Sequence, residues 1–129
     1  MCGIFGLLTS DKSIYKQEFL SSSFIHLASL SETRGKDSSG ICTLDQNLNT
    51  INILKGPIPV QKMINENSFK NNLLVAFKEN NYARYAFGHS RLVTNGSQLN
   101  DINNQPISKD GLVAVHNGII ANIDDLWNK

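Results

Sequence analysis

The sequence predicts one domain of the α+β class, in which strands and helices both occur along 129 residues. Residues 2–9 (CGIFGLLT) are short, apolar and interrupted by glycine, a pattern typical of a buried strand. Residues 17–31 (QEFLSSSFIHLASLS) place apolar side chains near helical spacing, which predicts an amphipathic helix. The pair Asn117-Gly118 interrupts LVAVHNGII, and such a pair predicts the turn of a β-hairpin.

Shorter elements fill the rest of the chain. We expect ICTL and NTINIL to form the two strands of a hairpin around DQNLN, and YAFGHSRLVT (85–94) to form another strand. A short helix is expected at VQKMINE, NNLLVAF fits either a helix or a strand, and NGSQLNDINNQP is expected to be a long loop. Asn122 can cap a last helix with Asp124 and Asp125 in its first turn. Because the sequence stops at Lys129, we expect an incomplete domain.

Composition excludes several functional classes. Lys+Arg 12 against Asp+Glu 11 gives a formal net charge of +1, which offers no electrostatic footprint for nucleic acid or for a membrane surface. The N-terminus lacks the basic region of a signal peptide, and no apolar stretch is long enough to span a membrane. Two cysteines without CxxC spacing favour a reducing, cytoplasmic location over a disulfide scaffold.

Cys2 directly follows the initiator methionine. If Met1 is removed, this residue carries a thiol and a free α-amine on one carbon. An α-amine has a pKa of about 7.7–8.0, so near neutral pH a useful fraction can accept the thiol proton. Gly3 would then let a substrate approach the backbone closely. The alternative is that Cys2 is a small apolar residue of an edge strand.

Four further motifs accompany the N-terminal MCGIFG: RGKDSSG (34–40), GHSRLVTNG (88–96), NQP (104–106) and VHNGIIAN (115–122). In this order they resemble the motifs of the class II glutamine amidotransferases, whose glutaminase domains belong to the N-terminal-nucleophile hydrolases. The resemblance extends from Cys2 to about Trp127. HNGII and RGxDSSG are most similar to the domain that serves glucosamine-6-phosphate synthases.

The resemblance implies roles for individual residues. Cys2 would attack the side-chain amide of glutamine and form a γ-glutamyl thioester. Asn117 and Gly118 would form the oxyanion hole through a side-chain amide and a backbone N–H. Arg91 would grip the α-carboxylate, to which a guanidinium fork is well matched. Further positions would line the pocket (Thr94, Gly96) or belong to the loop packed by the nucleophile (Arg34, Asp37), and Arg34 would help to hold the N-terminal strand.

The resemblance also implies an αββα sandwich of two stacked antiparallel sheets, of which residues 1–129 would supply the first half to two-thirds. The implied partners are L-glutamine and a synthase domain or subunit that receives the ammonia, with homodimerisation through the missing part. No cofactor and no metal is expected. Leu92 and Asn95 stand where the sugar-phosphate branch usually has tryptophan and histidine. The family's acidic residue for the α-ammonium would lie beyond Lys129.

Competing interpretations remain. Gly35-Lys36 suggests a phosphate-binding loop, but Leu30 and Asp37 occupy positions where the motif requires Gly and Ser or Thr. Histidines at 26, 89 and 116 lack the spacing of a metal site, while a Cys–His catalytic pair stays conceivable. The chain could also be a fragment that binds glutamine without hydrolysing it. Another branch, such as asparagine synthetase or amidophosphoribosyltransferase, is the third alternative.

Overall fold

The computed structural model describes residues 2–79, 82–93, 96–122, 125–126 and 128, and within them a four-stranded antiparallel sheet forms the centre of the fold. Its strand order is β1-β4-β2-β3. β1 therefore pairs with β4, and each of the two middle strands, β4 and β2, has a hydrogen-bonded neighbour on both sides. The strands are β1 (Gly3–Thr9), β2 (Ser38–Asp45), β3 (Thr50–Gly56) and β4 (Arg84–Arg91).

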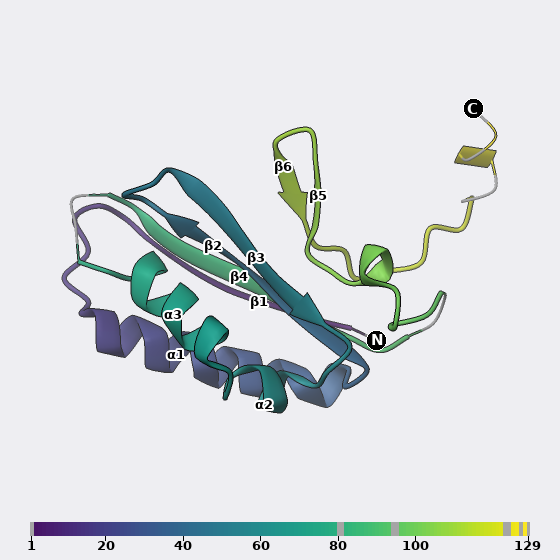
Figure 1. The fold of residues 1–129 in the computed structure, drawn as a ribbon, viewed down its shortest axis with the longest axis horizontal. Coiled ribbons are helices and arrows are strands. Elements are labelled where there is room, and N and C mark those ends of the chain that lie inside the picture. Colours follow the sequence, from purple (N-terminus) through teal and green to yellow (C-terminus); the bar gives the residue numbers. More distant parts are fainter. Residues whose placement is uncertain (1, 80–81, 94–95, 123–124, 127, 129) are drawn as a thin grey trace.

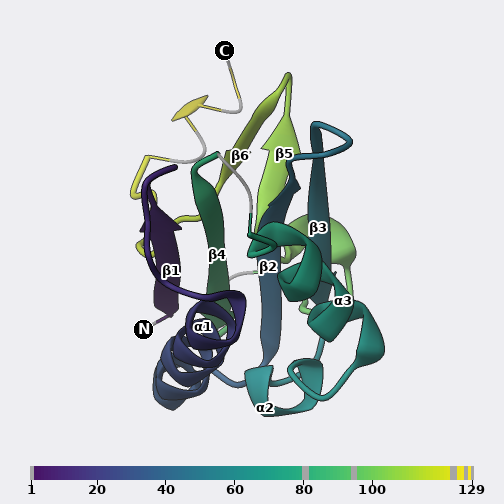
Figure 2. The same cartoon turned by 90° about the vertical axis from the view of Figure 1, so that its left-hand side faces the viewer.

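Three α-helices cover one face of this sheet (Figure 1). They are α1 (Gln17–Ser31), α2 (Val60–Met63) and α3 (Asn67–Ala76), and short 3-10 turns follow at Glu32–Arg34 and Asp101–Asn103. A second, two-stranded antiparallel sheet pairs β5 (Ile107–Lys109) with β6 (Leu112–Ala114). This hairpin lies on the side of the large sheet opposite the helices, as the two views show (Figures 1 and 2). The predicted α+β class is thereby confirmed.

The core lies between the helices and the sheet. Phe24 on α1 is fully buried at its centre, with ring centroids 5.3 Å from Phe5, 6.3 Å from Phe69 and 6.0 Å from Phe77. These rings come from β1, α3 and the end of α3, so one aromatic side chain joins both long helices to the sheet. The described helices include none long and apolar enough to cross a membrane.

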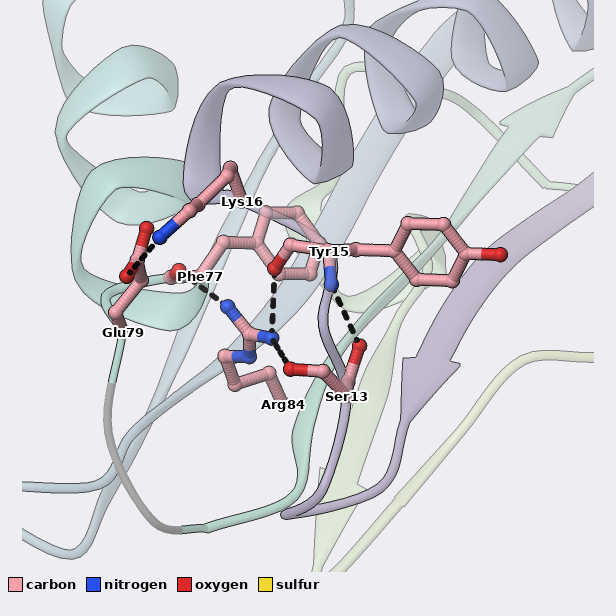
Figure 3. Close-up of polar contacts among 6 residues, drawn as sticks. All are labelled: Ser13, Tyr15, Lys16, Phe77, Glu79 and Arg84. Carbon is pink, nitrogen blue, oxygen red and sulfur yellow. Dashed lines mark hydrogen bonds and ion pairs between the residues drawn. The ribbon is translucent and has the colours of Figure 1, made fainter.

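Arg84 fixes the end of the sheet far from the N-terminus. Its side chain is only 3% exposed, and its guanidinium donates to the carbonyl oxygens of Phe77 at 3.3 Å, Tyr15 at 3.0 Å and Ser13 at 3.5 Å (Figure 3). The carbonyl of Phe77 lies at the C-terminal, electronegative end of α3, where a cation is favoured. Arg84 therefore ties the loop before α1 and the end of α3 to β4.

The element predictions hold for most of the chain. The helix over 17–31 and the first strand are confirmed, and so is the hairpin formed by β2 and β3. β2 begins at Ser38, three residues before the predicted start. The ambiguous segment NNLLVAF lies in α3 up to Ala76, and the helix buries one face through its residues at 69, 73 and 76. The strand predicted over 85–94 ends at Arg91.

The hairpin predicted at Asn117-Gly118 is wrong. The turn lies at Asp110-Gly111, where φ is +50° and +79°, and β6 ends at Ala114. Two positive φ values in succession are what a type I′ hairpin turn requires, and Gly118 has no positive φ. For the helix predicted after Asn122, the structure gives one contact, a hydrogen bond of 3.2 Å from Leu126 N–H to the Asn122 carbonyl. Asp124 lies outside the described residues.

Candidate active site

One end of the large sheet gathers most of the residues singled out in the sequence. Antiparallel pairing sets Gly3 opposite Ser90 and Ser38 opposite Arg91. The start of β1, the end of β4 and the start of β2 therefore lie at the same end of the sheet. Cys2, Arg91 and Asp37 are therefore neighbours, although 89 residues separate the first two. The N-terminus lies at this end in Figure 1.

Cys2 is partly exposed, and its carbonyl oxygen is a meeting point of three chain segments. Arg34 donates to this oxygen through Nε at 3.0 Å, and Asn117 donates through Nδ2 at 2.8 Å. The thiol Sγ lies 3.6 Å from the carbonyl oxygen of Leu92. The backbone of Cys2 is thus fixed from two sides while its sulfur faces the segment that follows β4.

The loop after α1 packs against the end of β4. A Cβ at Gly35 would lie 2.3 Å from the carbonyl carbon of Arg91, so glycine is the residue that allows this approach. The Asp37 N–H donates to the Arg91 carbonyl at 2.9 Å, and the Asp37 carboxylate accepts from Val93 N–H at 2.7 Å. Asp37 therefore holds the backbone on both sides of Leu92, whose carbonyl contacts the thiol.

Arg91 is held in a polar surrounding and is only 8% exposed. Its Nη1 donates to Asn104 Oδ1 at 3.3 Å. Asn104 is fully buried, donates through Nδ2 to the Gln98 carbonyl at 2.7 Å, and accepts at its own carbonyl from Lys55 Nζ at 2.9 Å. The loop between β4 and β5 thus positions the guanidinium.

The segment 116–118 approaches the site without being part of a strand. Gln105 accepts from His116 N–H through Oε1 and donates through Nε2 to the His116 carbonyl at 3.0 Å. A Cβ at Gly118 would lie 2.9 Å from His116 Nε2, so the imidazole packs over this glycine. Within the described part of the chain, no acceptor pairs with the Gly118 N–H.

His89 is fully buried on β4, on the sheet face turned toward the site. Desolvation lowers the pKa of His89 to about 4; the nearby charges of Arg91 and His116 act in the same direction, and the backbone of His116 opposes them. Within the described residues, neither ring nitrogen of His89 has a hydrogen-bond partner, so burial dominates. His89 is therefore neutral at physiological pH.

Comparison with curated proteins gives matches over almost the whole chain. In an alignment of 137 positions, the chain is 33% identical to the glutamine–fructose-6-phosphate aminotransferase (isomerizing) of Wigglesworthia glossinidia brevipalpis. This alignment covers 100% of the chain. Identity is 31% to the protein of that name from Encephalitozoon cuniculi and 30% to the one from Clostridium perfringens, with 98% and 99% of the chain covered. This similarity over almost the whole chain is what membership of the class II glutamine amidotransferase family predicts. The chain spans 18% of the length of each of these relatives, and no protein-family model matches it.

The structure describes some of the predicted site residues of this chain and not others. Cys2, Arg34 and Asn117 share hydrogen bonds, and Asp37 and Arg91 lie on the adjoining backbone. Gly96 is exposed, has φ +71°, and lies against Asn103. Thr94, Asn95 and Met1 lie outside the described residues.

The structure also describes Gly3, the second cysteine and the side chains that could bind a metal. A Cβ at Gly3 would meet Ser90 Oγ at 2.5 Å and the Ser31 carbonyl at 2.8 Å, so this glycine allows β4 and α1 to approach the start of β1 closely. Burial raises the pKa of the Cys42 thiol to about 11, which makes it a poor nucleophile. The described residues contain no group of three or more His, Cys, Asp or Glu that could hold a metal.

Asn104 and Gln105 were missed as individual residues. The sequence signal was the NQP motif, whose place between two glycine-rich motifs marks it without revealing which groups it contacts. Its contacts with Arg91 and His116 join residues 13 and 11 positions apart across a loop. Motif spacing cannot predict such contacts, because the loop path decides them.

Proposed function

We propose that this chain forms the glutaminase part of a glutamine amidotransferase and hydrolyses the side-chain amide of L-glutamine to glutamate and ammonia. The supporting observation is the 2.8 Å hydrogen bond from Asn117 Nδ2 to the Cys2 carbonyl. It brings the proposed nucleophile next to the proposed oxyanion donor across 115 residues of sequence. The names of the relatives state glutamine as a substrate of those proteins.

The proposed reaction begins after removal of Met1. The free α-amine of Cys2 accepts the thiol proton, and Sγ forms a bond to the amide carbon of glutamine. The carbon–nitrogen bond then breaks, and the leaving group departs as ammonia with the proton returned by the terminal ammonium. Water attacks the resulting γ-glutamyl thioester, which releases glutamate and restores the thiol. Every bond that forms or breaks in these steps belongs to Cys2, glutamine or water.

We assign the oxyanion hole to Asn117 and Gly118. A side-chain amide has two N–H donors, and Asn117 uses one of them on the Cys2 carbonyl, which leaves the second for the tetrahedral intermediate. The Gly118 N–H supplies the other donor. Loss of one such donor typically lowers the rate by about 10²–10³-fold.

The glutamine α-carboxylate is assigned to Arg91, with Thr94 and Gly96 lining the same pocket. Because Asn104 fixes one end of the guanidinium, its planar fork is prepared for a bidentate carboxylate. Arg34 and Asp37 support the site: the first holds the Cys2 carbonyl, and the second holds the backbone around Leu92.

The same proposal covers the architecture. We assign residues 1–129 to a glutaminase domain of the N-terminal-nucleophile hydrolase type, in which a second sheet stacks on the face of the large sheet that the helices leave open. The position of the β5–β6 hairpin on that face supports this arrangement. The ammonia would pass to a synthase part of the protein, and the relatives' names favour fructose 6-phosphate as its acceptor.

The test replaces the nucleophile in the intact protein, with whatever further domains its gene encodes. Cys2→Ala is expected to abolish glutamate release from glutamine while circular dichroism and the melting temperature stay near those of the parent. The matched control is Cys42→Ala, which removes a buried thiol opposite Phe87 within the sheet and is expected to keep glutaminase activity. Measurable turnover by Cys2→Ala would reject the proposal.

A further inference from the structure

Gln105 makes an unusual double contact with the segment that carries the proposed oxyanion donors. Its side-chain amide accepts from the N–H of His116 and donates to the carbonyl of the same residue. This pairing resembles that of a neighbouring strand, in which one residue exchanges two hydrogen bonds with another. Residues 115–118 are in no strand, so the Gln105 amide takes the place of a strand neighbour.

Gln105 can act as a support because its own backbone is fixed. Both of its neighbours, Asn104 and Pro106, are almost completely buried. Its carbonyl oxygen lies so close to Gly40 of β2 that a Cβ there would come within 2.2 Å of it. The side chain therefore extends from a backbone that is packed against the large sheet. Asn117, next to the residue that Gln105 holds, reaches the Cys2 carbonyl.

We propose that Gln105 is a positioning residue that sets the location of Asn117 and Gly118 relative to Cys2. This inference rests on the proposed function. Oxyanion donors act only when they lie within hydrogen-bond distance of the position that the developing charge will occupy, and a displacement of about 1 Å can cost about 10²-fold in rate. Gln105 does not touch the substrate. It acts on Asn117 and Gly118 through its hydrogen bonds to the backbone of His116.

The neighbouring residue makes the inference specific. Asn104 contacts Arg91, the proposed carboxylate ligand, whereas Gln105 contacts the oxyanion segment. General damage to the loop would therefore weaken glutamine capture and raise KM. Loss of the Gln105 amide alone should instead lower kcat and leave KM within about twofold, because binding of the ground state does not use the oxyanion donors.

The experiment compares Gln105→Ala and Gln105→Glu in the intact protein by steady-state glutamate release between about pH 5 and pH 8. We expect Gln105→Ala to lower kcat by about 10–100-fold relative to the parent at every pH. In Gln105→Glu, an ionised carboxylate would face the His116 carbonyl with an acceptor instead of a donor. The protonated carboxyl restores one donor and one acceptor, so the ratio of variant to parent kcat should rise as the pH falls.

The matched control is Gln46→Glu, because Gln46 donates to the Ala83 carbonyl at 2.7 Å in a turn at the other end of the sheet. This substitution makes the same chemical change far from the proposed oxyanion donors. Its kcat ratio to the parent should stay near one across the pH range.

An unchanged kcat in Gln105→Ala, or a rise in KM alone, would overturn the inference. If Gln105→Ala does not fold, a kcat ratio for Gln105→Glu that is independent of pH would overturn it. A parent protein without glutaminase activity would contradict the proposed function instead. Amide hydrogen exchange then decides about Gln105 separately: faster exchange of the His116 N–H in a variant supports the positioning role, and unchanged exchange contradicts it.

Discussion

At the scale of single residues, the Cys2 carbonyl is where separate parts of the chain meet. Arg34 from the loop after α1 and Asn117 from the segment after β6 donate to the same oxygen. Both donors fix the backbone of Cys2, directly before β1, at a chain end that would otherwise fray. The identities of these residues were predictable from the motifs, whereas their shared acceptor was not, because it depends on how two distant loops fold over β1.

Arg91→Lys tests the proposed carboxylate site. Lysine keeps the charge but loses the planar fork and its contact with Asn104, so we expect KM for glutamine to rise by about tenfold or more with a smaller change in kcat. Steady-state glutaminase kinetics of the intact protein measure both constants. An unchanged KM would mean that the α-carboxylate is held elsewhere. Lys36→Gln on the exposed loop is a suitable control for the loss of a nearby surface charge.

His89 makes the free energy of unfolding depend on pH in the acid range. Burial holds its folded-state pKa at about 4, below the value of about 6.5 for an unfolded histidine, so the unfolded chain takes up the proton first as the pH falls. The free energy of unfolding should therefore decrease between about pH 6.5 and pH 4, by about 3 kcal/mol in total from this residue. Urea denaturation of the chain at several pH values measures this loss.

The matched variants for this measurement are His89→Leu and His26→Gln. The first should remove the contribution of the buried imidazole and flatten the acid side of the stability profile. The second alters an exposed histidine on α1 and should keep the loss seen in the parent. The same acid slope in His89→Leu as in the parent would contradict the assignment.

At the scale of elements, the predictions held where periodicity was strong and failed where turn chemistry decided. The helix over 17–31 has the predicted bounds, because its buried positions at 20, 24, 28 and 31 follow helical spacing. The Asn117-Gly118 turn was wrong, because Asp110-Gly111 accepts the two positive φ values that the hairpin needs. Both pairs have suitable residues for a type I′ turn, so sequence alone could not choose between them.

Arg84→Met tests how strongly the elements depend on one buried cation. The variant leaves three carbonyl oxygens without their donor at the junction of α3, β4 and the loop before α1, and we expect it to lower the free energy of unfolding by about 3 kcal/mol. The neighbouring Lys16–Glu79 ion pair is exposed, at 3.1 Å (Figure 3). Lys16→Gln should therefore cost less than about 1 kcal/mol. Equal effects of both variants in urea denaturation would contradict the role given to Arg84.

At the scale of the whole molecule, the large sheet has one face in the core and one turned toward the site. Successive side chains of a strand point to opposite faces of the sheet. Because Phe5 points into the core, Ile4 and Leu8 on the same strand point to the other face. Leu8 is 74% exposed there. The mixture of strands and helices was predictable from local patterns, but the order β1-β4-β2-β3 was not, because it depends on which strands pair across long stretches of sequence.

Phe24→Ala tests whether the aromatic core holds the layers together. Phe24 joins β1 to both long helices, and we expect its truncation to lower the free energy of unfolding by about 3–5 kcal/mol. Phe19 lies on the same helix but is half exposed and stacks on Tyr15. Phe19→Ala should cost less than about 1 kcal/mol. A small effect of Phe24→Ala in urea denaturation would show that the layers are held by other contacts.

The most direct measurement of the proposed function is the mass of the intact protein, with and without glutamine, after rapid quenching in acid. We predict that the resting protein lacks one methionine residue, and that glutamine adds one glutamyl group, located at Cys2 by peptide mapping and absent in Cys2→Ala. A chain that keeps Met1, or a glutamyl group attached to any residue other than Cys2, would contradict a mechanism built on the terminal thiol and amine.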